Sequence, residues 1–127
     1  MEPHLATDLA VSLTDDRPGE LAKAIGAVSG AGINIDGYIE IAGVVHVLTT
    51  DLEAARRCLH AAGFRVVQEQ QVALVPVADE AGAAARVFQR IAEARINVRY
   101  SYLATRNRLV ISSEKPQAIL DALNSST

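Results

Sequence analysis

The sequence predicts an α+β protein made of two tandem ferredoxin-like βαββαβ units with antiparallel sheets, the second of which lacks its last strand. Two observations predict this fold class. The chain repeats itself at an offset of 63 residues, and both copies carry the apolar periodicities of strands and helices in the same order. A chain of 127 residues, half of them apolar, is long enough for two very small modules. We expect these modules at residues 1–70 and 71–127.

The tandem repeat is clearest between residues 16–35 and residues 79–98, which match in Asp, Gly, Ile and Asn and in most apolar positions. Near the second helix of each copy the offset becomes 64, so that Leu59 matches Leu123. One inserted residue accounts for this change. The pairs at offset 63 include Gly19 and Gly82, Asn34 and Asn97, and Val47 and Val110.

In the first copy, alternating apolar residues predict strands, and apolar residues at i, i+3, i+4 and i+7 predict helices. Pro18 suits the first turn of the first helix and Gly32 suits its C-terminal cap. Asp51 should begin the second helix, and Gly63 should end it. The inward residues are Leu21, Ala24, Ile25 and Val28 in the first helix and Leu52, Ala55, Leu59 and Ala62 in the second. The predicted strands are residues 8–14, 33–41, 44–50 and 64–70, with a tight turn at Ala42 and Gly43.

The second copy predicts the same elements except for its last strand. The position that matches Phe64 would be residue 128, so the fourth strand of this copy has no sequence to form it. Residues 72–77 would then be an edge strand with unpaired backbone groups, and Pro76 fits either an edge or a strand end. The predicted elements are strands at residues 72–77, 96–105 and 108–113 and helices at residues 82–95 and 116–124, with Ala84, Val87, Phe88 and Ile91 inward.

The missing fourth strand of the second copy affects how the protein would assemble. No Gly or Pro interrupts residues 64–75, so the fourth strand of the first copy could run into the first strand of the second. We expect the open edge to be covered by a second chain or by the first copy, which would give a homodimer or a compact pseudo-dimer.

The turn TDDRPGEL at residues 14–21, followed by GINI at residues 32–35, is the strongest local indication of function. We expect both segments at the same end of the unit, where they would form one small pocket. Free N–H groups and the positive dipole at a helix start favour a carboxylate, while oxygens of Asp16 and Asn34 can accept from an ammonium group. This chemistry suits an amino acid. The predicted ligand-binding residues are Thr14, Asp16, Arg17, Pro18, Gly19, Glu20, Leu21, Asn34 and Ile35 in the first copy and Asp79, Gly82, Asn97 and Val98 in the second.

Residues 16–35, DRPGELAKAIGAVSGAGINI, resemble the opening of an ACT domain, a βαββαβ regulatory module that commonly binds amino acids. The pattern D-x-P-G followed by G-I-N-I is fairly specific for that family. The chain as a whole resembles small stand-alone proteins of two ACT modules without an attached enzyme. The resemblance implies ligand contacts, often at an interface between two modules, on Thr14, Asp16, Gly19, Asn34 and Ile35.

The second copy departs from this pattern. Ala81 stands where the family has proline, Arg95 stands where it has glycine, and Glu80 matches Arg17. A Glu80 carboxylate that points towards the helix start would disfavour a carboxylate ligand, so the first copy is the stronger candidate site.

The candidate residues also have structural explanations. Asp16 can cap the first helix, which Pro18 and Gly19 can begin. Asn34 and Asn97 can hydrogen-bond to their own turns. Repetition does not decide between the two explanations, because a repeated turn needs repeated turn residues.

Composition excludes several other classes of protein. The formal net charge is −3 without a basic run, which argues against nucleic acid as a partner. One cysteine, Cys58, and three scattered histidines predict neither an intrachain disulfide nor a metal site, and no cofactor is expected. The sequence has neither a signal peptide nor a long apolar segment, so we expect a cytoplasmic protein without membrane contact.

The sequence contains no nucleophile with a base, no paired carboxylates and no metal cluster at a recognisable spacing, so we expect no catalytic activity. The predicted function is regulation through binding of a small molecule, most plainly an amino acid. Two alternatives stay open. One is a protein-association scaffold without a ligand, and the other is a small ferredoxin-like enzyme, for which Arg17 gives only weak support because Glu80 replaces it in the second copy.

Overall fold

The computed structural model describes residues 2–13 and 17–124 of the chain. It contains two compact units. Thr7–Gln70 is called the first module below, and Met1–Ala6 together with Gln71–Thr127 is called the second module. One unit ends at Gln70, and the main part of the other begins at Gln71. Residues 1–6, which we expected in the first module, cluster with the second.

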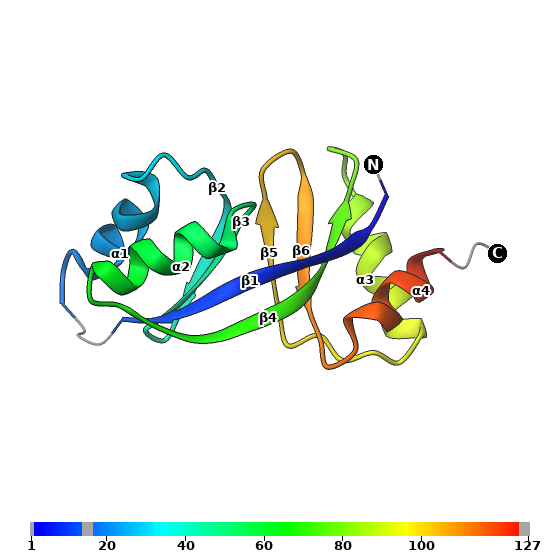
Figure 1. Ribbon diagram of the computed structural model, residues 1–127. Helices are drawn as coiled ribbons and strands as arrows, with labels where there is room; N and C mark the ends of the chain where they lie inside the picture. The colour runs from blue at the N-terminus through cyan, green and yellow to red at the C-terminus, as the bar shows by residue number, and fades with distance from the viewer. Residues whose placement is uncertain (1, 14–16, 125–127) are drawn as a thin grey trace. The chain divides into compact units, whose positions relative to one another are not determined.

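The first module has two helices on one face of an antiparallel sheet (Figure 1). Its elements are β1 (His4–Ser12), α1 (Glu20–Ser29), β2 (Ile35–Ile41), β3 (Val44–Thr49), α2 (Leu52–Ala61) and the first part of β4 (Arg65–Pro76). The strand order is β2-β3-β1-β4. Side chains alternate along a strand, so Leu9 and Val11 of β1 enter the core beneath the helices while Asp8 and Ala10 lie on the other face.

Both helices of the first module bury the stripe that the sequence predicts. α2 begins directly after Asp51, whose carboxylate accepts a hydrogen bond from the Ala54 N–H at 3.2 Å. α1 begins at Glu20, so Pro18 lies just outside the helix instead of in its first turn. The fully buried helix residues are Ala24 and Val28 of α1 and Ala55 and Leu59 of α2.

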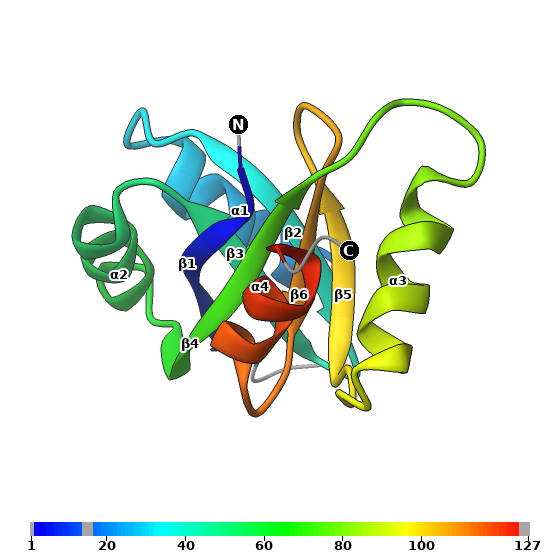
Figure 2. The same cartoon turned by 90° about the vertical axis from the view of Figure 1, so that its right-hand side faces the viewer.

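The second module contains the rest of β4, then α3 (Ala83–Glu93), β5 (Tyr100–Ala104), β6 (Arg108–Ser112) and α4 (Pro116–Asn124) (Figure 2). Its strand order is β1-β4-β6-β5. Ala84, which we expected to point inward, is exposed. The residue before it, Ala83, is buried instead, because it lies on the same face of α3 as Val87 and Ile91.

The edge of the second module is covered within the chain, which is one of the two arrangements that we expected. β4 lies between β1 and β6, so its second half has a neighbouring strand on each side. The N-terminal end of β1 occupies the place of the missing fourth strand: residues 1–6 belong to this module, and Leu5 packs against its core. The repeat did not indicate which segment covers the edge, because β1 begins four residues before the strand that we predicted from Asp8 onward. Pro76 is the last residue of β4, which explains why a proline is tolerated there.

The α+β class with antiparallel strands is confirmed, with four helices among the described residues. The strands form one six-stranded sheet in the order β2-β3-β1-β4-β6-β5 instead of two separate sheets. The reason is that β1 and β4 each run through both modules, and no Gly or Pro interrupts β4 before its last residue.

The two hairpins turn through residue pairs with positive φ, Ala42 and Gly43 between β2 and β3, and Arg106 and Asn107 between β5 and β6. Two-residue turns of this kind match the twist of the flanking strands. Within residues 2–13 and 17–124, no helix has the length and apolar character needed to cross a membrane.

Candidate functional site

The turn into α1 is the first part of the predicted ligand site. Gly19 directly precedes the helix with a φ of 93°, a left-handed conformation that favours glycine. Residues 17–19 are exposed. Thr14 and Asp16, two of the predicted contacts, lie outside the described residues. Gly19 therefore has a conformational reason to be in the turn besides any role towards a ligand.

Backbone amides at the start of α1 provide hydrogen-bond donors. The Glu20 N–H donates to the Arg17 carbonyl at 3.3 Å. The amides of Leu21 and Ala22 have no acceptor within α1, because the residues four positions before them precede the helix. These donors and the positive end of the helix dipole suit an anionic group. The Glu20 carboxylate lies 3.9 Å from the Arg17 guanidinium.

The turn into α3 has the same backbone conformation. Gly82 directly precedes α3 with a φ of 87°, and the Ala83 N–H donates to the Glu80 carbonyl at 3.2 Å. The Glu80 carboxylate forms an ion pair with Arg86 at 3.1 Å. Asp79 and Gly82 are both exposed. The second copy thus keeps the shape of this turn although it lacks the proline.

The start of β2 is the second part of the predicted site. The exposed Asn34 donates from Nδ2 to Oδ1 of Asp36 at 2.9 Å, and its carbonyl accepts from Oγ1 of Thr49 at 2.9 Å. Asp36 and Thr49 are buried, so these bonds fix the backbone where β2 begins. We missed both residues, although the Asn-x-Asp spacing at a strand start could have indicated the first bond. A hollow of about 470 Å³ lies here, lined by Ile25, Ser29, Gly32, Ile33, Asn34, Ile35 and Tyr38.

The expectation that these two parts meet within one unit is wrong. Ser12, near the turn into α1, pairs with Val44, and Val44 pairs with Ile41 at the far end of β2. Ile35, the first residue of β2, pairs with Thr49 at the opposite end of β3. β1 and β2 run parallel to each other, so the chain must travel back along α1, over about 15 Å, before β2 can begin.

The second module separates its predicted residues in the same way. Asp79 and Gly82 lie before α3, whereas Asn97 and Val98 follow it. Asn97 is exposed and lines a hollow of about 720 Å³. The lining residues are Ala94, Arg95, Ile96, Asn97 and Arg99 from the segment between α3 and β5, and Ser113, Glu114, Lys115, Ala118, Asp121 and Ala122 from the end of β6 onward.

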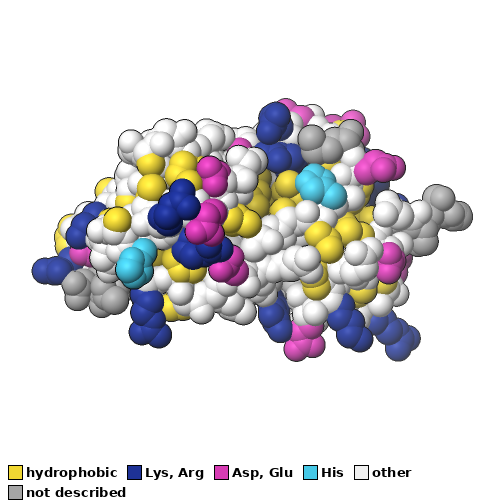
Figure 3. All heavy atoms as spheres, viewed as in Figure 1, with side chains coloured by type: hydrophobic (Ala, Val, Ile, Leu, Met, Phe, Trp, Pro, Cys, Tyr) yellow, Lys and Arg dark blue, Asp and Glu magenta, His cyan; other side chains and the backbone are white. Residues whose placement is uncertain are grey.

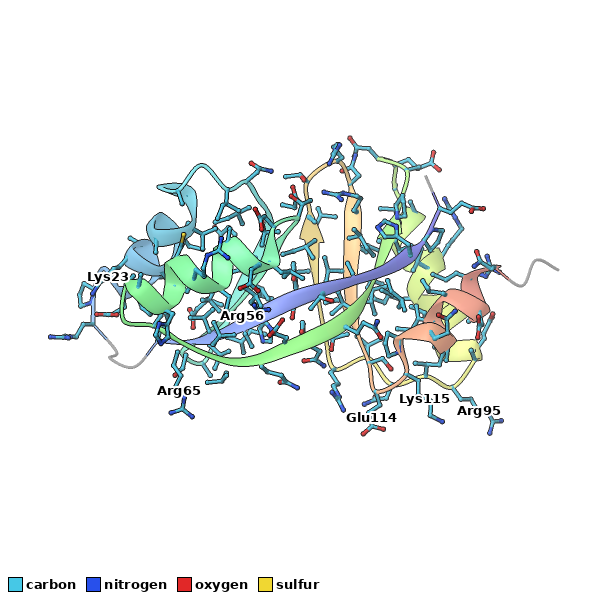
Figure 4. The ribbon with its side chains drawn as sticks, viewed as in Figure 1. Lys23, Arg56, Arg65, Arg95, Glu114 and Lys115 are labelled. Carbon is cyan, nitrogen blue, oxygen red and sulfur yellow. The ribbon has the colours of Figure 1, made fainter. Side chains whose placement is uncertain are left out.

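Charged side chains also gather around Arg56 of α2. Figure 3 shows basic and acidic groups next to one another in this part of the first module, and Figure 4 labels Arg56. Hydrogen bonds to Glu69 and Glu53 raise the pKa of the Arg56 guanidinium. Because arginine is already protonated at every pH at which proteins fold, this network has no acid–base use. The described residues hold no group of three or more His, Cys, Asp or Glu side chains placed for a metal ion.

The sequence matches no protein-family model and no curated protein. The fold, in contrast, is similar to that of solved structures over nearly the whole chain. Protein BT0572 from Bacteroides thetaiotaomicron has a TM-score of 0.80 at 21% identity, covering 95% of this chain and 88% of that chain.

Solved structures with this fold include aspartate kinase regulatory subunits. The ligand-free regulatory subunit from Thermus thermophilus has a TM-score of 0.63 at 21% identity, covering 97% of this chain and 95% of that chain. Aspartokinase III of E. coli, in complex with lysine and aspartate, has a TM-score of 0.60 at 18% identity, covering 94% of this chain and 31% of that chain. At these identities the similarity establishes the fold.

Proposed function

We propose that this chain is a regulatory protein of two ACT modules that binds an amino acid and catalyses no reaction. The observation that carries the proposal is the segment at residues 14–21, whose sequence has the D-x-P-G pattern and in which Gly19 is left-handed at the start of a helix. The similarity in fold to an aspartate kinase regulatory subunit, over almost the full length of both chains, supports it.

The proposed ligand contacts follow from the donors and acceptors in the two segments. The amides of Leu21 and Ala22 would bind the carboxylate of the amino acid. Asn34 donates from Nδ2 to Asp36, which orients its side chain and leaves the amide oxygen to accept from the ammonium group. Asp16 would be a second acceptor for that group.

The two segments belong to opposite ends of one module, so we propose that a second copy of the chain brings them together. In this homodimer, the helix start of one copy and Asn34 of its partner would contact the same ligand. The exposed apolar side chains of edge strand β2, Tyr38 at 53% and Ile41 at 47% exposure, support an association through this part of the module.

Binding is tested by calorimetry and thermal unfolding with each of the twenty amino acids. A true ligand present at about ten times its Kd should stabilise the protein by about 1.4 kcal/mol. Asn34→Ala and Asp16→Ala should each remove this effect, while Asn97→Ala, the matched change in the second copy, should keep it. No stabilisation by any amino acid would contradict the proposal and favour a scaffold without a ligand.

Mixing the two inactive variants tests the shared site. In a heterodimer of Asp16→Ala and Asn34→Ala chains, one of the two sites contains both native residues. Half of the dimers in an equal, fully exchanged mixture are heterodimers, so binding should return at about a quarter of all sites. If the mixture fails to bind the ligand although size-exclusion with light scattering shows a dimer, the ligand does not bridge the two copies.

A further inference from the structure

The hollow of about 720 Å³ in the second module is lined by residues that include three cations, Arg95, Arg99 and Lys115. Arg95 and Arg99 come from the segment between α3 and β5, and Lys115 directly precedes α4. Figure 4 labels Arg95 and Lys115, which lie at the same end of the second module. The hollow also contains two acidic residues, Glu114 and Asp121.

The two acidic residues already have partners. Glu114 forms an ion pair with Arg99 at 3.4 Å, and Asp121 accepts a hydrogen bond from Nε2 of Gln117 at 3.1 Å. Among the described residues, no carboxylate lies within ion-pair distance of Arg95 or Lys115. Gln117 is a neutral donor and leaves the Asp121 charge in place, so the three cations of the hollow exceed its two carboxylates by one charge. Arg95 and Lys115 are the two cations of the hollow that no described carboxylate pairs with.

Arg95 occupies a backbone position that suits glycine. Its φ is 60°, and the matching residue of the first copy, Gly32, has a φ of 80°. The two turns also share a hydrogen bond: the Arg95 N–H donates to the Ala92 carbonyl at 2.9 Å, and the Gly32 N–H donates to the Ser29 carbonyl at 3.0 Å. A side chain in the left-handed region carries an energetic cost that glycine avoids. The second copy accepts this cost and gains a guanidinium at the hollow.

Lys115 is also unfavourable for its local structure. The matching residue, at offset 64, is Asp51, which caps α2 through its hydrogen bond to the Ala54 N–H. A lysine cannot accept such a bond, and a positive charge at a helix start opposes the helix dipole. Arg99 matches the buried Asp36 at offset 63. Across these three positions, two negative charges in the first copy become three positive charges in the second.

We infer that this hollow binds a small molecule with a doubly charged oxyanion group, such as a phosphate ester or a dicarboxylate. Two residues that are locally unfavourable, at positions 95 and 115, line the same hollow and carry the same charge, which is the pattern expected where a site overrides local structure. Guanidinium groups bind phosphate and carboxylate oxygens through paired hydrogen bonds, and the ammonium of Lys115 adds a further donor.

This inference goes beyond the proposed amino-acid site, since both the ligand class and most of the residues differ. The test is an NMR titration of the full chain with inorganic phosphate and, separately, with succinate, at constant ionic strength. Saturable shifts of the amides of residues 94–99 and 113–118 are expected. The anion that saturates the site at the lower concentration shows whether the natural ligand is a phosphate ester or a dicarboxylate.

Two variants and one matched control connect binding to the hollow. Arg95→Gly and Lys115→Asp restore the residues of the first copy and should weaken binding by at least about tenfold. Arg106→Gly removes an arginine with the same φ of 60° from the β5–β6 turn and should leave binding unchanged. Both hollow variants should unfold at the same or a higher temperature than the native protein, so that lost binding cannot come from lost structure.

The inference is overturned if neither anion gives saturable shifts, or if Arg95→Gly and Lys115→Asp bind as tightly as Arg106→Gly. Asn34→Ala should still bind the anion, because Asn34 does not line this hollow. Anion binding without amino-acid binding would therefore refute the proposed function alone, and the reverse result would refute this inference alone.

Discussion

The two modules have the same order of strands and helices but differ in charge at three matching positions, which lie after the first helix, near the start of the next strand and before the second helix. The first copy carries Gly32, Asp36 and Asp51, each of which serves its own turn, strand start or helix cap. The second copy carries cations at the matching positions, 95, 99 and 115, and two of these residues are unfavourable for local structure. The comparison shows that the fold tolerates residues at positions 95 and 115 that do not suit the local turn or helix start. Such residues indicate a function other than stability.

The turns into α1 and α3 show the opposite behaviour. Their glycines have nearly equal φ values, 93° for Gly19 and 87° for Gly82, although only the first turn contains a proline. The left-handed glycine is therefore what shapes this turn, and Pro18 is not needed for it. Four pairs of substitutions test how far the modules are alike, in order of expected effect.

The largest effect should come from the buried helix position that matches in both modules. Val28 of α1 and Ile91 of α3 are almost fully buried. Ile91→Ala should lower the free energy of unfolding by about 2–5 kcal/mol, and Val28→Ala by less, because fewer buried methyl and methylene groups are lost. Urea denaturation monitored by circular dichroism measures both. Equal losses would show that the two cores relax differently around the cavity.

The next effect concerns a polar pair that only the first module has. Nδ1 of His46 on β3 lies 3.6 Å from the buried Asp8 carboxylate, whereas the residue that matches His46 on β6 is Leu109. His46→Leu removes one charged or polar neighbour of a buried carboxylate and should cost about 2 kcal/mol. The exposed His60→Leu is the control for urea denaturation. A cost no larger than that of the control would mean that the remaining contacts of Asp8 suffice.

A smaller effect is expected at the two left-handed glycines. Gly19→Ala and Gly82→Ala should each cost about 1–2 kcal/mol, since both place a β-carbon in the left-handed region. A β-carbon at residue 19 has no atom within 4 Å, and at residue 82 it meets only the flexible end of Arg86 at 3.2 Å. Thermal unfolding of the two variants should therefore give similar shifts. A large difference would mean that packing, and not φ, decides one of the positions.

The smallest effect should appear at the residues that precede α2 and α4. Asp51→Ala removes a helix cap and should cost about 1 kcal/mol. Lys115→Asp adds a cap at the matching position and should stabilise the protein by about 0.5 kcal/mol. Thermal unfolding in a buffer without phosphate or dicarboxylates measures both changes in stability. Destabilisation by Lys115→Asp would show that Lys115 serves the fold, which would weaken the argument for the anion site.

Local pattern predicted most of the elements. The helix at residues 116–124 has the predicted bounds, and the inward stripes of α1 and α2 are buried as expected, because both follow from spacing along the chain. The predicted site residues are less secure. The structure places residues 17–21 and residues 34–35 at opposite ends of the module, and the polar partners of Asn34, namely Asp36 and Thr49, were not foreseen.

The sequence by itself determined the duplication, the order of strands and helices, and the glycine turn before the first helix of each copy, because each of these depends on residues that are close in the chain. Only the tertiary structure decided which strand fills the vacant place in the second module and which segments share an end of the sheet. Strand pairing joins residues far apart in sequence. The backbone hydrogen bonds that join the strands are the same for nearly every residue type, so the side chains do not indicate which strands will pair. For the same reason, only the folded structure shows that the cations at positions 95, 99 and 115 line one hollow.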